Sequence, residues 1–286
     1  MAARGKKECQ HCNRKIGILF QPKAPAAVAL AKELAKVVED KGTPAWLCSA
    51  WEEDRACQQV EGTKFIVCLG GDGTILRAAR IASPYCVPIL GVNLGRLGFM
   101  TEISADDALS RVPDFLEGEG WVEERAMLQA DLLSSKNPPF HALNDVVVGR
   151  GERCRLIRVK ADIDGEPLTT YKCDALILST ATGSTAYSLA AGGPVLNPQA
   201  EEIVMKPVAA HLSLSTALVL PSESVVELKV STTHQATLSV DGQVEVPLRD
   251  GDVVRVKRSP YVTRLLRSQW PAIFYETLVQ RLEKRE

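Results

Sequence analysis

The sequence predicts an α/β protein in which a Rossmann-like parallel-sheet domain precedes a β-rich, sandwich-like domain. In the first part of the chain, continuously apolar strand segments alternate with segments of helical periodicity, which is typical of a parallel sheet covered on both faces. From about Trp121 onward, short alternating strands and turn signals replace the long helices. Asp164-Gly165 and Asp241-Gly242 each separate two strand-like runs and predict hairpin turns.

The elements of the first part follow from the apolar pattern. Strands are predicted at 15–20, 45–48, 65–69 and 87–92, and helices over 26–41 and 74–82. The first helix rests on apolar residues at helical spacing, among them Leu30, Leu34 and Val38, and Gly42 ends it as a C-terminal glycine does. We therefore divide the chain into a flexible basic arm over 1–14, an α/β domain over 15–124, a β-rich domain over 125–265 and a C-terminal helix within 266–286 that returns to the α/β domain.

Composition narrows the class of protein. The net charge is −1 and aromatic residues make up 5% of the 286 residues, so neither nucleic acid nor a membrane is an expected partner. Apolar runs are too short for a signal peptide or a transmembrane helix. Cysteines such as Cys48, Cys68 and Cys173 lie among apolar residues, as they do in a reducing compartment, and we expect a cytoplasmic protein. Cys9 and Cys12 have no second pair, so no zinc site is predicted.

The strongest motif is Gly70-Gly71-Asp72-Gly73-Thr74, between an apolar strand and a helix. Glycines let backbone N–H groups approach a phosphate, and the helix N-terminus favours an anion. A carboxylate in such a loop needs a compensating role, and Asp72 can accept a proton from an attacking hydroxyl or hold a divalent metal. The alternative is a tight turn in which Asp72 caps the following helix.

Two further polar segments interrupt apolar strands. In Thr180–Tyr187, hydroxyls beside Gly183 can donate to phosphate or ribose oxygens, and Tyr187 offers a face to a base. In the second segment, the Asn144 amide suits a purine edge and the Asp145 carboxylate suits ribose hydroxyls. The alternatives are an ordinary loop for the first segment and an Asx-type turn before a strand for the second.

In this order and spacing, these segments resemble the NAD kinase family. Further matches are the Asn93–Phe99 segment, Asp174 before the hydroxyl-rich segment, and Asp241-Gly242-Gln243. The resemblance spans residues 15 to about 270. It implies transfer of the terminal phosphoryl group of ATP, or of polyphosphate, to the 2′-hydroxyl of the adenosine ribose of NAD, which gives NADP. It also implies a divalent metal, with Mg²⁺ expected, and a homodimer or homotetramer that binds the dinucleotide through the 125–265 domain.

The resemblance also assigns site residues. Asp72 matches the catalytic proton acceptor, and Gly70, Gly71 and Thr74 match the phosphate loop. No residue is assigned as a metal ligand. Substrate-binding positions are matched by Gly73, Arg77, Asn144, Asp145, Arg155, Lys172, Asp174, Thr185, Ala186, Tyr187, Ser188, Leu189, Ala190 and Gln243. Arg155 and Lys172 are expected on the strands that follow.

Several positions depart from the family pattern, among them Ala210-His211 and Thr216-Ala217, which replace a Pro-His segment that ends in Arg-Pro. Ala181 stands where Pro is usual, Ala190 where Ser is usual, and Thr216 where Arg is usual. Loss of a hydroxyl at Ala190 costs about 1 kcal/mol of binding if that bond forms in the family. The alternatives to an NAD kinase are a lipid kinase that shares the Gly-Gly-Asp-Gly-Thr loop, of the diacylglycerol or sphingoid type, and a non-catalytic dinucleotide sensor.

Overall fold

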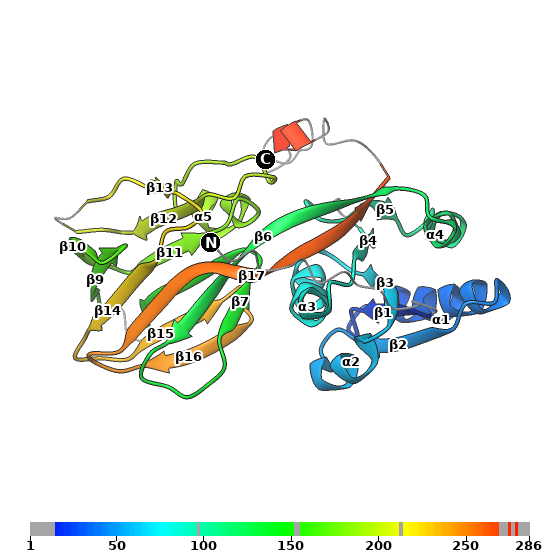
Figure 1. Ribbon diagram of the computed structural model, residues 1–286, viewed down its shortest axis with the longest axis horizontal. Helices are drawn as coiled ribbons and strands as arrows, with labels where there is room; N and C mark the ends of the chain where they lie inside the picture. The colour runs from blue at the N-terminus through cyan, green and yellow to red at the C-terminus, as the bar shows by residue number, and fades with distance from the viewer. Residues whose placement is uncertain are drawn as a thin grey trace, which may run out of the picture. The chain divides into compact units, whose positions relative to one another are not determined.

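The structure is a computed structural model that describes residues 15–95, 98–151, 155–211, 214–268, 274–275 and 278–279. It divides into two compact units (Figure 1). The first unit comprises residues up to Glu123 together with those from Thr263, and the second unit comprises Glu124–Val262. The boundary falls inside two long strands, β6 and β17. The expected basic arm over 1–14 lies outside the described residues.

The first unit alternates strands with helices. Its elements are β1 (Lys15–Phe20), α1 (Pro25–Asp40), β2 (Ala45–Ser49), α2 (Glu53–Val60), β3 (Thr63–Leu69), α3 (Asp72–Ala82), the short 3-10 helix η1 (Ser83–Tyr85), β4 (Ile89–Asn93), β5 (Ile103–Ser104), α4 (Ala108–Glu117) and the end of β17 (Val253–Arg267). The strands lie in the order β2-β1-β3-β4 with the end of β17 beside β4, and these pairs are parallel. The carboxyl ends of β1 to β4 therefore lie at one edge of the sheet.

Helices cover both faces of this sheet. Alternate strand residues, such as Ile18 and Val67, form one core cluster with α1 and α4. The other face is packed by α3, because a Cβ placed on Gly91 of β4 would meet the Ile75 side chain. The strands read as continuous apolar runs for this reason, since both of their faces are buried.

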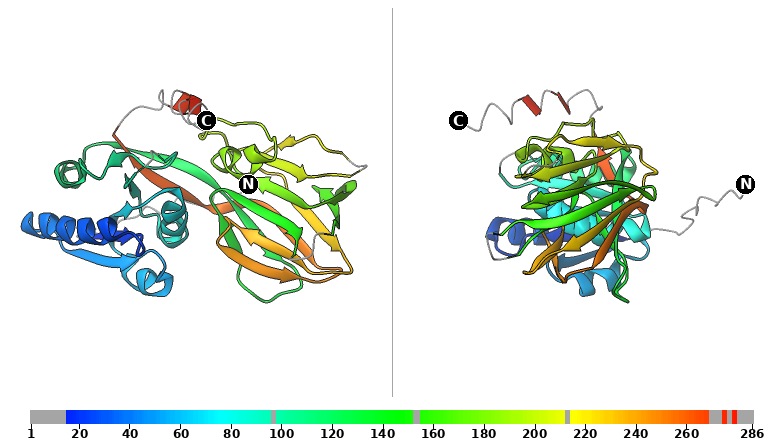
Figure 2. Two further views of the ribbon diagram at one scale, coloured as in Figure 1. Left: turned by 180° about the vertical axis from the view of Figure 1, so that it is seen from behind. Right: turned by 90° about the vertical axis from the view of Figure 1, so that its left-hand side faces the viewer.

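The second unit consists of strands with short helical turns. Its elements are β6 (Trp121–Leu132), β7 (Phe140–Ala142), β8 (Asp145–Arg150), β9 (Ile157–Ile163), β10 (Glu166–Cys173), β11 (Ala175–Ser179), the 3-10 helix η2 (Gly183–Thr185), α5 (Tyr187–Ala190), β12 (Ile203–Val208), β13 (Leu218–Leu220), β14 (Val226–Ser231), β15 (Ala236–Val240), β16 (Val244–Leu248) and most of β17. One sheet contains β10-β9-β14-β17 with β6 and β7, and the other runs β13-β12-β11-β8-β15-β16 (Figure 2).

The two sheets of the second unit enclose one apolar core. Its residues come from both sheets, for example Val159 and Leu228 from one and Leu176 and Leu238 from the other. The predicted fold class is thereby confirmed. Both predicted hairpins are also present, since β9 pairs with β10 and β15 with β16. The central residues of both turns have positive φ, which suits the Asp-Gly sequence.

Several boundaries differ from the expected ones. Helix α2 was not predicted, and α3 begins at Asp72 rather than at residue 74. Most of the expected C-terminal helix lies outside the described residues. Of this segment, the structure describes Phe274–Tyr275 and Leu278–Val279, and both pairs are helical. The Phe274 ring lies 6.5 Å from the Phe99 ring of the first unit, and the return of this helix stays a prediction.

Candidate active site

The glycine-rich loop of the first unit connects β3 to α3 at the carboxyl edge of the parallel sheet. Gly70 lies so close to Thr74 that an added Cβ would meet its hydroxyl at 2.3 Å. Gly71 and Gly73 are exposed, and a Cβ at either position would face open space. Their backbone is therefore accessible at the start of a helix, where amide groups and the helix dipole favour an anion.

Asp72, the first residue of α3, is half-buried and turns towards the segment 98–101. Its Oδ2 accepts the Phe99 N–H at 2.9 Å and its Oδ1 accepts the Met100 N–H at 3.1 Å. Gly71 takes the N-cap position and Asp72 is the first helical residue, which differs from the capping alternative. A carboxylate has about four acceptor positions. The two amides thus orient both oxygens and leave each with capacity for another donor.

Arg77 lies one turn further along α3 and contacts an aromatic ring. Its guanidinium carbon is 4.4 Å from the centre of the Trp51 ring, which follows β2. Burial is the largest cause of the lowered pKa of Arg77, with the nearby Arg80 second. The guanidinium stays charged in proteins. Trp51 was missed by sequence reasoning, since nothing in a lone exposed Trp indicates its partner.

In the second unit, three separate segments converge around Asn144. The Asp241 carboxylate accepts the backbone N–H groups of Leu143, Asn144 and Asp145 at 2.7 to 3.0 Å. From the other side, the Thr180 N–H donates to the Asn144 carbonyl at 2.9 Å. The turn is thus held from two sides by residues that directly follow β15 and β11. In the Asx-turn alternative, its own side chain would hold it.

Gly183 permits this convergence. A Cβ added there would lie 2.1 Å from the Asn144 carbonyl oxygen, so any other residue would push the two segments apart. The Thr180 hydroxyl completes the contact by donating to the Leu143 carbonyl at 2.6 Å and accepting the Gly183 N–H at 3.0 Å. The glycine of the hydroxyl-rich segment is therefore explained by close packing.

The side chains of Asn144 and Asp145 are available to form hydrogen bonds with a ligand. Neither side chain has a hydrogen-bond partner within the part of the chain that the structure describes, although Asp145 is only 6% exposed. Burial, and secondly the charge of Asp241, raise the pKa of Asp145 to about 7 from an ordinary 3.8. A buried carboxylate without hydrogen bonds is costly, so a ligand that donates hydrogen bonds to it would be well bound.

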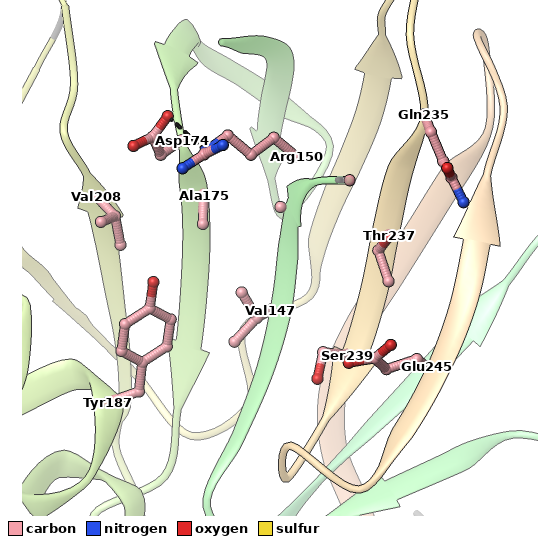
Figure 3. Close-up of a pocket in the computed structure, with 12 residues that line it drawn as sticks. Val147, Arg150, Asp174, Ala175, Tyr187, Val208, Gln235, Thr237, Ser239 and Glu245 are labelled. Atoms are coloured by element: carbon pink, nitrogen blue, oxygen red, sulfur yellow. Dashed lines mark ion pairs between the residues drawn. The ribbon is translucent and has the colours of Figure 1, made fainter. Parts of the chain in front are cut away.

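A hollow of about 520 Å³ lies on the outer face of the six-stranded sheet (Figure 3). Asp174 and Arg150 form an ion pair of 3.0 Å at its edge. Tyr187, the first residue of α5, is exposed and lies over the same hollow, with Ser239 and Glu245 across from it. The lining mixes charged, hydroxyl and apolar groups, which is the composition of a site for a polar small molecule.

Comparison with known proteins decides the family. The ATP-NAD kinase N-terminal domain model matches residues 23–120, and the ATP-NAD kinase C-terminal domain model matches residues 143–268. An NAD kinase of Dehalococcoides mccartyi is 45% identical over 273 residues, which cover 94% of this chain and 96% of the relative. The chain belongs to the NAD kinase family.

Other relatives agree with this assignment. An NAD kinase of Chloroflexus aurantiacus is 39% identical over 272 residues, covering 94% of this chain and 99% of the relative. Yeast NADH kinase, solved in complex with NADH, has a TM-score of 0.79 at 25% identity and covers 97% of this chain and 89% of its own. An NAD kinase of Archaeoglobus fulgidus, solved in complex with ATP, shows the same fold with a TM-score of 0.75 at 24% identity. The match covers 95% of this chain and 100% of the Archaeoglobus fulgidus chain.

The protein is therefore an enzyme that phosphorylates NAD. The lipid kinase and non-catalytic sensor alternatives give way, because relatives that match nearly the whole chain are named NAD kinase. No helix among the described residues is long and apolar enough to cross a membrane.

The remaining predicted residues of the kinase are dispersed over the second unit. Thr185 donates its hydroxyl to the Thr182 carbonyl at 3.1 Å, and Gln243 ends the Asp241 turn. In the short helix α5 and the residue before it, Ala186 and Leu189 are half-buried, Ala190 is exposed and Ser188 is fully buried. Among the described residues, the Ser188 hydroxyl has no hydrogen-bond partner.

The two basic residues predicted to lie on strands, Lys172 and Arg155, differ in where the structure places them. Lys172 is exposed on β10, as expected. Arg155 precedes β9 instead of lying on a strand, because β9 begins at Ile157, and its guanidinium lies 3.0 Å from the His234 ring nitrogen. At the departures from the family pattern, Ala181 is buried with its carbonyl bonded to Ser184, and Thr216 is exposed.

Proposed function

We propose that the protein transfers the terminal phosphoryl group of ATP to the 2′-hydroxyl of the adenosine ribose of NAD, giving NADP. The observation that carries the proposal is the Asp72 carboxylate, whose two oxygens are fixed by backbone amides beside the exposed glycines of the phosphate loop. Membership of the NAD kinase family supplies the substrate, and this geometry supplies a group for the chemistry.

The acceptor hydroxyl needs orientation more than activation. Phosphoryl transfer depends mainly on holding the attacking oxygen in line with the donor and on stabilising charge. The Asp72 carboxylate keeps acceptor capacity on both oxygens, so it can hold the ribose hydroxyl and take up its proton. Its amide donors prevent it from turning away during that step.

The donor phosphates are assigned to the phosphate loop. The exposed backbone at Gly71 and Gly73 and the N-terminus of α3 suit a phosphate group, with Gly70 and Thr74 shaping the loop. Arg77, steadied by the Trp51 ring, supplies the positive charge on the same helix. The ATP bound in the Archaeoglobus fulgidus enzyme supports ATP as the donor, and polyphosphate is the alternative donor to be assayed.

The dinucleotide is assigned to residues of the second unit, and Gly73 and Arg77 of the first unit are proposed as substrate-binding residues beside the donor phosphates. The Asn144 amide and the Asp145 carboxylate, which lack protein partners among the described residues, are proposed to bind the adenosine. Tyr187 and Asp174, beside the hollow, are proposed to contact the rest of the molecule. The same role is proposed for Thr185, Ala186, Ser188, Leu189, Ala190, Gln243, Lys172 and Arg155.

A divalent cation, expected to be Mg²⁺, does not fit a resident site built by the protein alone. The described residues contain no group of three or more His, Cys, Asp or Glu side chains suited to a metal. Mg²⁺ is commonly held by substrate phosphates with few protein ligands. A divalent cation bound by the donor phosphates would neutralise part of their charge, and the proton transfer is assigned to Asp72.

Assembly and location are proposed on the family resemblance. A homodimer or homotetramer is expected, and light scattering on the purified protein measures its mass. A cytoplasmic location is supported by Cys48, Cys68 and Cys173, which are buried free thiols.

The central experiment incubates the purified protein with NAD, ATP and Mg²⁺ and detects NADP with an NADP-specific dehydrogenase. Parallel reactions replace ATP with polyphosphate, NAD with NADH, and NAD with lipid vesicles. NADP formation from NAD and ATP is the expected result. Tight NAD binding without any NADP would point back to a non-catalytic sensor.

A further inference from the structure

The segment that holds Asp72 is itself held by a buried group of charges. Arg267, at the end of β17, donates from Nε to Glu123 Oε2 at 2.8 Å and from Nη1 to Glu102 Oε2 at 3.1 Å. The side chains of these three residues, which we call the Arg267 cluster, are 7 to 10% exposed. All of them belong to the first unit, as Asp72 does.

The Arg267 cluster reaches the backbone next to the Asp72 contacts. The Arg267 Nη1 group also donates to the Met100 carbonyl at 3.3 Å and the Thr101 carbonyl at 3.4 Å. Met100 thus binds Arg267 through its carbonyl and Asp72 through its N–H at 3.1 Å. Met100 therefore connects the Arg267 guanidinium to the proposed catalytic carboxylate of Asp72. A displacement of the guanidinium would move the Met100 backbone and, with it, the Asp72 carboxylate.

The surroundings fix the cluster as well. Glu102 Oε1 accepts both the backbone N–H and the hydroxyl of Ser268 at 2.7 Å, and the Glu102 N–H donates to the Gly91 carbonyl at 2.8 Å. Gly120 leaves no space beside it, because an added Cβ would meet the Arg267 carbonyl at 2.5 Å. The guanidinium therefore has one arrangement in which its bonds to carboxylates and carbonyls are all made.

The opposite side of the segment is equally tight. A Cβ on Gly98 would lie 2.3 Å from Asp72 Oδ1, and the Gly98 N–H donates to the Thr101 hydroxyl at 3.0 Å. The segment 98–101 is thus packed between Asp72 and Arg267. A shift of about 1 Å in a group that orients a reacting atom can cost about a hundredfold in rate.

We propose that Arg267 is a positioning residue that sets the direction of the Asp72 carboxylate through the peptide segment 98–101. This inference rests on the proposed role of Asp72. Arg267 acts on turnover, because the carboxylate is needed to orient and deprotonate the acceptor hydroxyl, while binding of NAD and ATP uses other groups.

The test compares Arg267→Lys with Arg255→Lys. Lysine keeps the charge but lacks the planar fork, so it cannot make the bonds to both carboxylates and both carbonyls. Arg255 lies on the same strand in an ion pair of 2.8 Å with Glu227, which is 40% exposed, and serves as the matched control. For Arg267→Lys, kcat falls about ten- to a hundredfold while the KM values for NAD and ATP stay within about twofold. Arg255→Lys leaves kcat and the KM values for NAD and ATP unchanged.

Two further measurements separate positioning from general loss of stability. In hydrogen exchange, Arg267→Lys accelerates exchange in the peptide that contains Phe99 and Met100, whereas Arg255→Lys does not. In the Asp72→Asn background, Arg267→Lys has little further effect on kcat, because its influence passes through the carboxylate. Ser268→Ala, which removes one bond to Glu102, shows the same pattern with a smaller loss and serves if Arg267→Lys folds poorly.

The outcomes distinguish this inference from the function on which it rests. Activity that survives Asp72→Asn would overturn the role of Asp72 itself. A strong effect of Asp72→Asn, combined with an unchanged kcat and unchanged exchange in Arg267→Lys, would overturn only the positioning role. Additive losses in the double variant would equally assign Arg267 to stability alone.

Discussion

In the first unit, both oxygens of Asp72 accept backbone N–H groups, whereas in the second unit the Asp145 carboxylate is buried beside Asp241 without a hydrogen bond from the described residues. Asp241 resembles Asp72 in this respect, since its oxygens accept three backbone N–H groups. Backbone N–H groups of the protein thus bind the carboxylates of Asp72 and Asp241, whereas the Asp145 carboxylate is available to a ligand.

In the proposed mechanism, this difference separates Asp72, which orients a substrate hydroxyl, from Asp145, which binds a ligand. Amide donors on both oxygens of Asp72 restrict its rotation, which is what a proton acceptor in a defined geometry requires. Burial of Asp145 costs stability when it is ionised, and that cost is offset when a ligand donates hydrogen bonds to it. The two sites therefore respond differently to the same Asp-to-Asn change.

Asp72→Asn has the largest expected effect on activity. Turnover falls by about 10²- to 10⁴-fold, the usual contribution of a general base, while the dissociation constant for NAD changes little. The NADP assay measures the first quantity and calorimetric titration with NAD measures the second. Asp114→Asn, at an exposed ion pair of the same unit, is the control. Near-normal turnover would remove Asp72 from the mechanism and erase the contrast with Asp145.

Asp145→Asn tests the binding side of the comparison. We expect the KM for NAD to rise about 10- to 100-fold, because hydrogen bonds to a charged group contribute about 1.5–3 kcal/mol. Asp250→Asn changes an exposed carboxylate of the same unit and should leave KM unaltered. A loss confined to kcat would mean that Asp145 acts in the chemistry as Asp72 does.

The same variant carries a pH signature. The pKa of Asp145 is about 7 in the folded protein against an ordinary 3.8, so between these values the folded state binds the extra proton. The free energy of unfolding therefore decreases as the pH rises through about 7, and Asp145→Asn removes that part of the decrease. Urea unfolding of both proteins at pH 5 and pH 8 measures the change. Parallel curves for the two proteins would contradict the perturbed carboxylate.

Gly183→Ala disturbs the second unit without altering any charge. Its Cβ would meet the Asn144 carbonyl, so we expect a loss of about 1–3 kcal/mol in the free energy of unfolding, as for other overpacked sites, together with weaker NAD binding. Urea unfolding measures the loss. Gly95→Ala places a Cβ in open space and is the matched control. Equal stability of the two variants would show that the contact relaxes freely.

Trp51→Ala has the smallest expected effect. Loss of a partly exposed cation–π contact of about 0.5–1 kcal/mol should raise the KM for ATP about two- to fivefold through Arg77 and leave the KM for NAD unchanged. Trp51→Phe should recover most of the affinity for ATP. An effect on NAD alone would reassign this face of α3 to the other substrate.

The sequence was sufficient for the fold class because its strongest signals are local. Apolar runs mark the strands of the parallel sheet, and Asp-Gly pairs mark two hairpins with positive φ. Helix α2 escaped prediction because only Ala56 and Val60 of its eight residues are buried, which leaves no apolar stripe. Helix α3 begins earlier than expected because Gly71 takes the N-cap position that a polar side chain usually marks.

Non-local contacts explain what the sequence could not show about the site. Motifs single out Asp72 and Asn144, but the partners of Asp72 lie 27 and 28 residues away, and Asp241, which binds the Asn144 N–H, lies 97 residues away. The Asp241-Gly242 pair indicates a turn, and nothing in it indicates that its carboxylate holds another turn. Arg267 resembles any other arginine of a strand, and only its buried partners distinguish it.

The first unit is built from two separate parts of the chain, residues up to Glu123 and residues from Thr263, and this has a consequence for its synthesis on the ribosome. Glu102 and Glu123 leave the ribosome well before Arg267, which follows Glu102 by 165 residues. At about 5–20 residues per second, on the order of ten to thirty seconds pass before the cation arrives. Until then, two carboxylates destined for the interior lack the Arg267 guanidinium, and the nascent sheet lacks its last parallel strand. The contacts that surround Asp72 can therefore be completed only after Arg267 has been synthesised, whereas the second unit is synthesised as one continuous stretch.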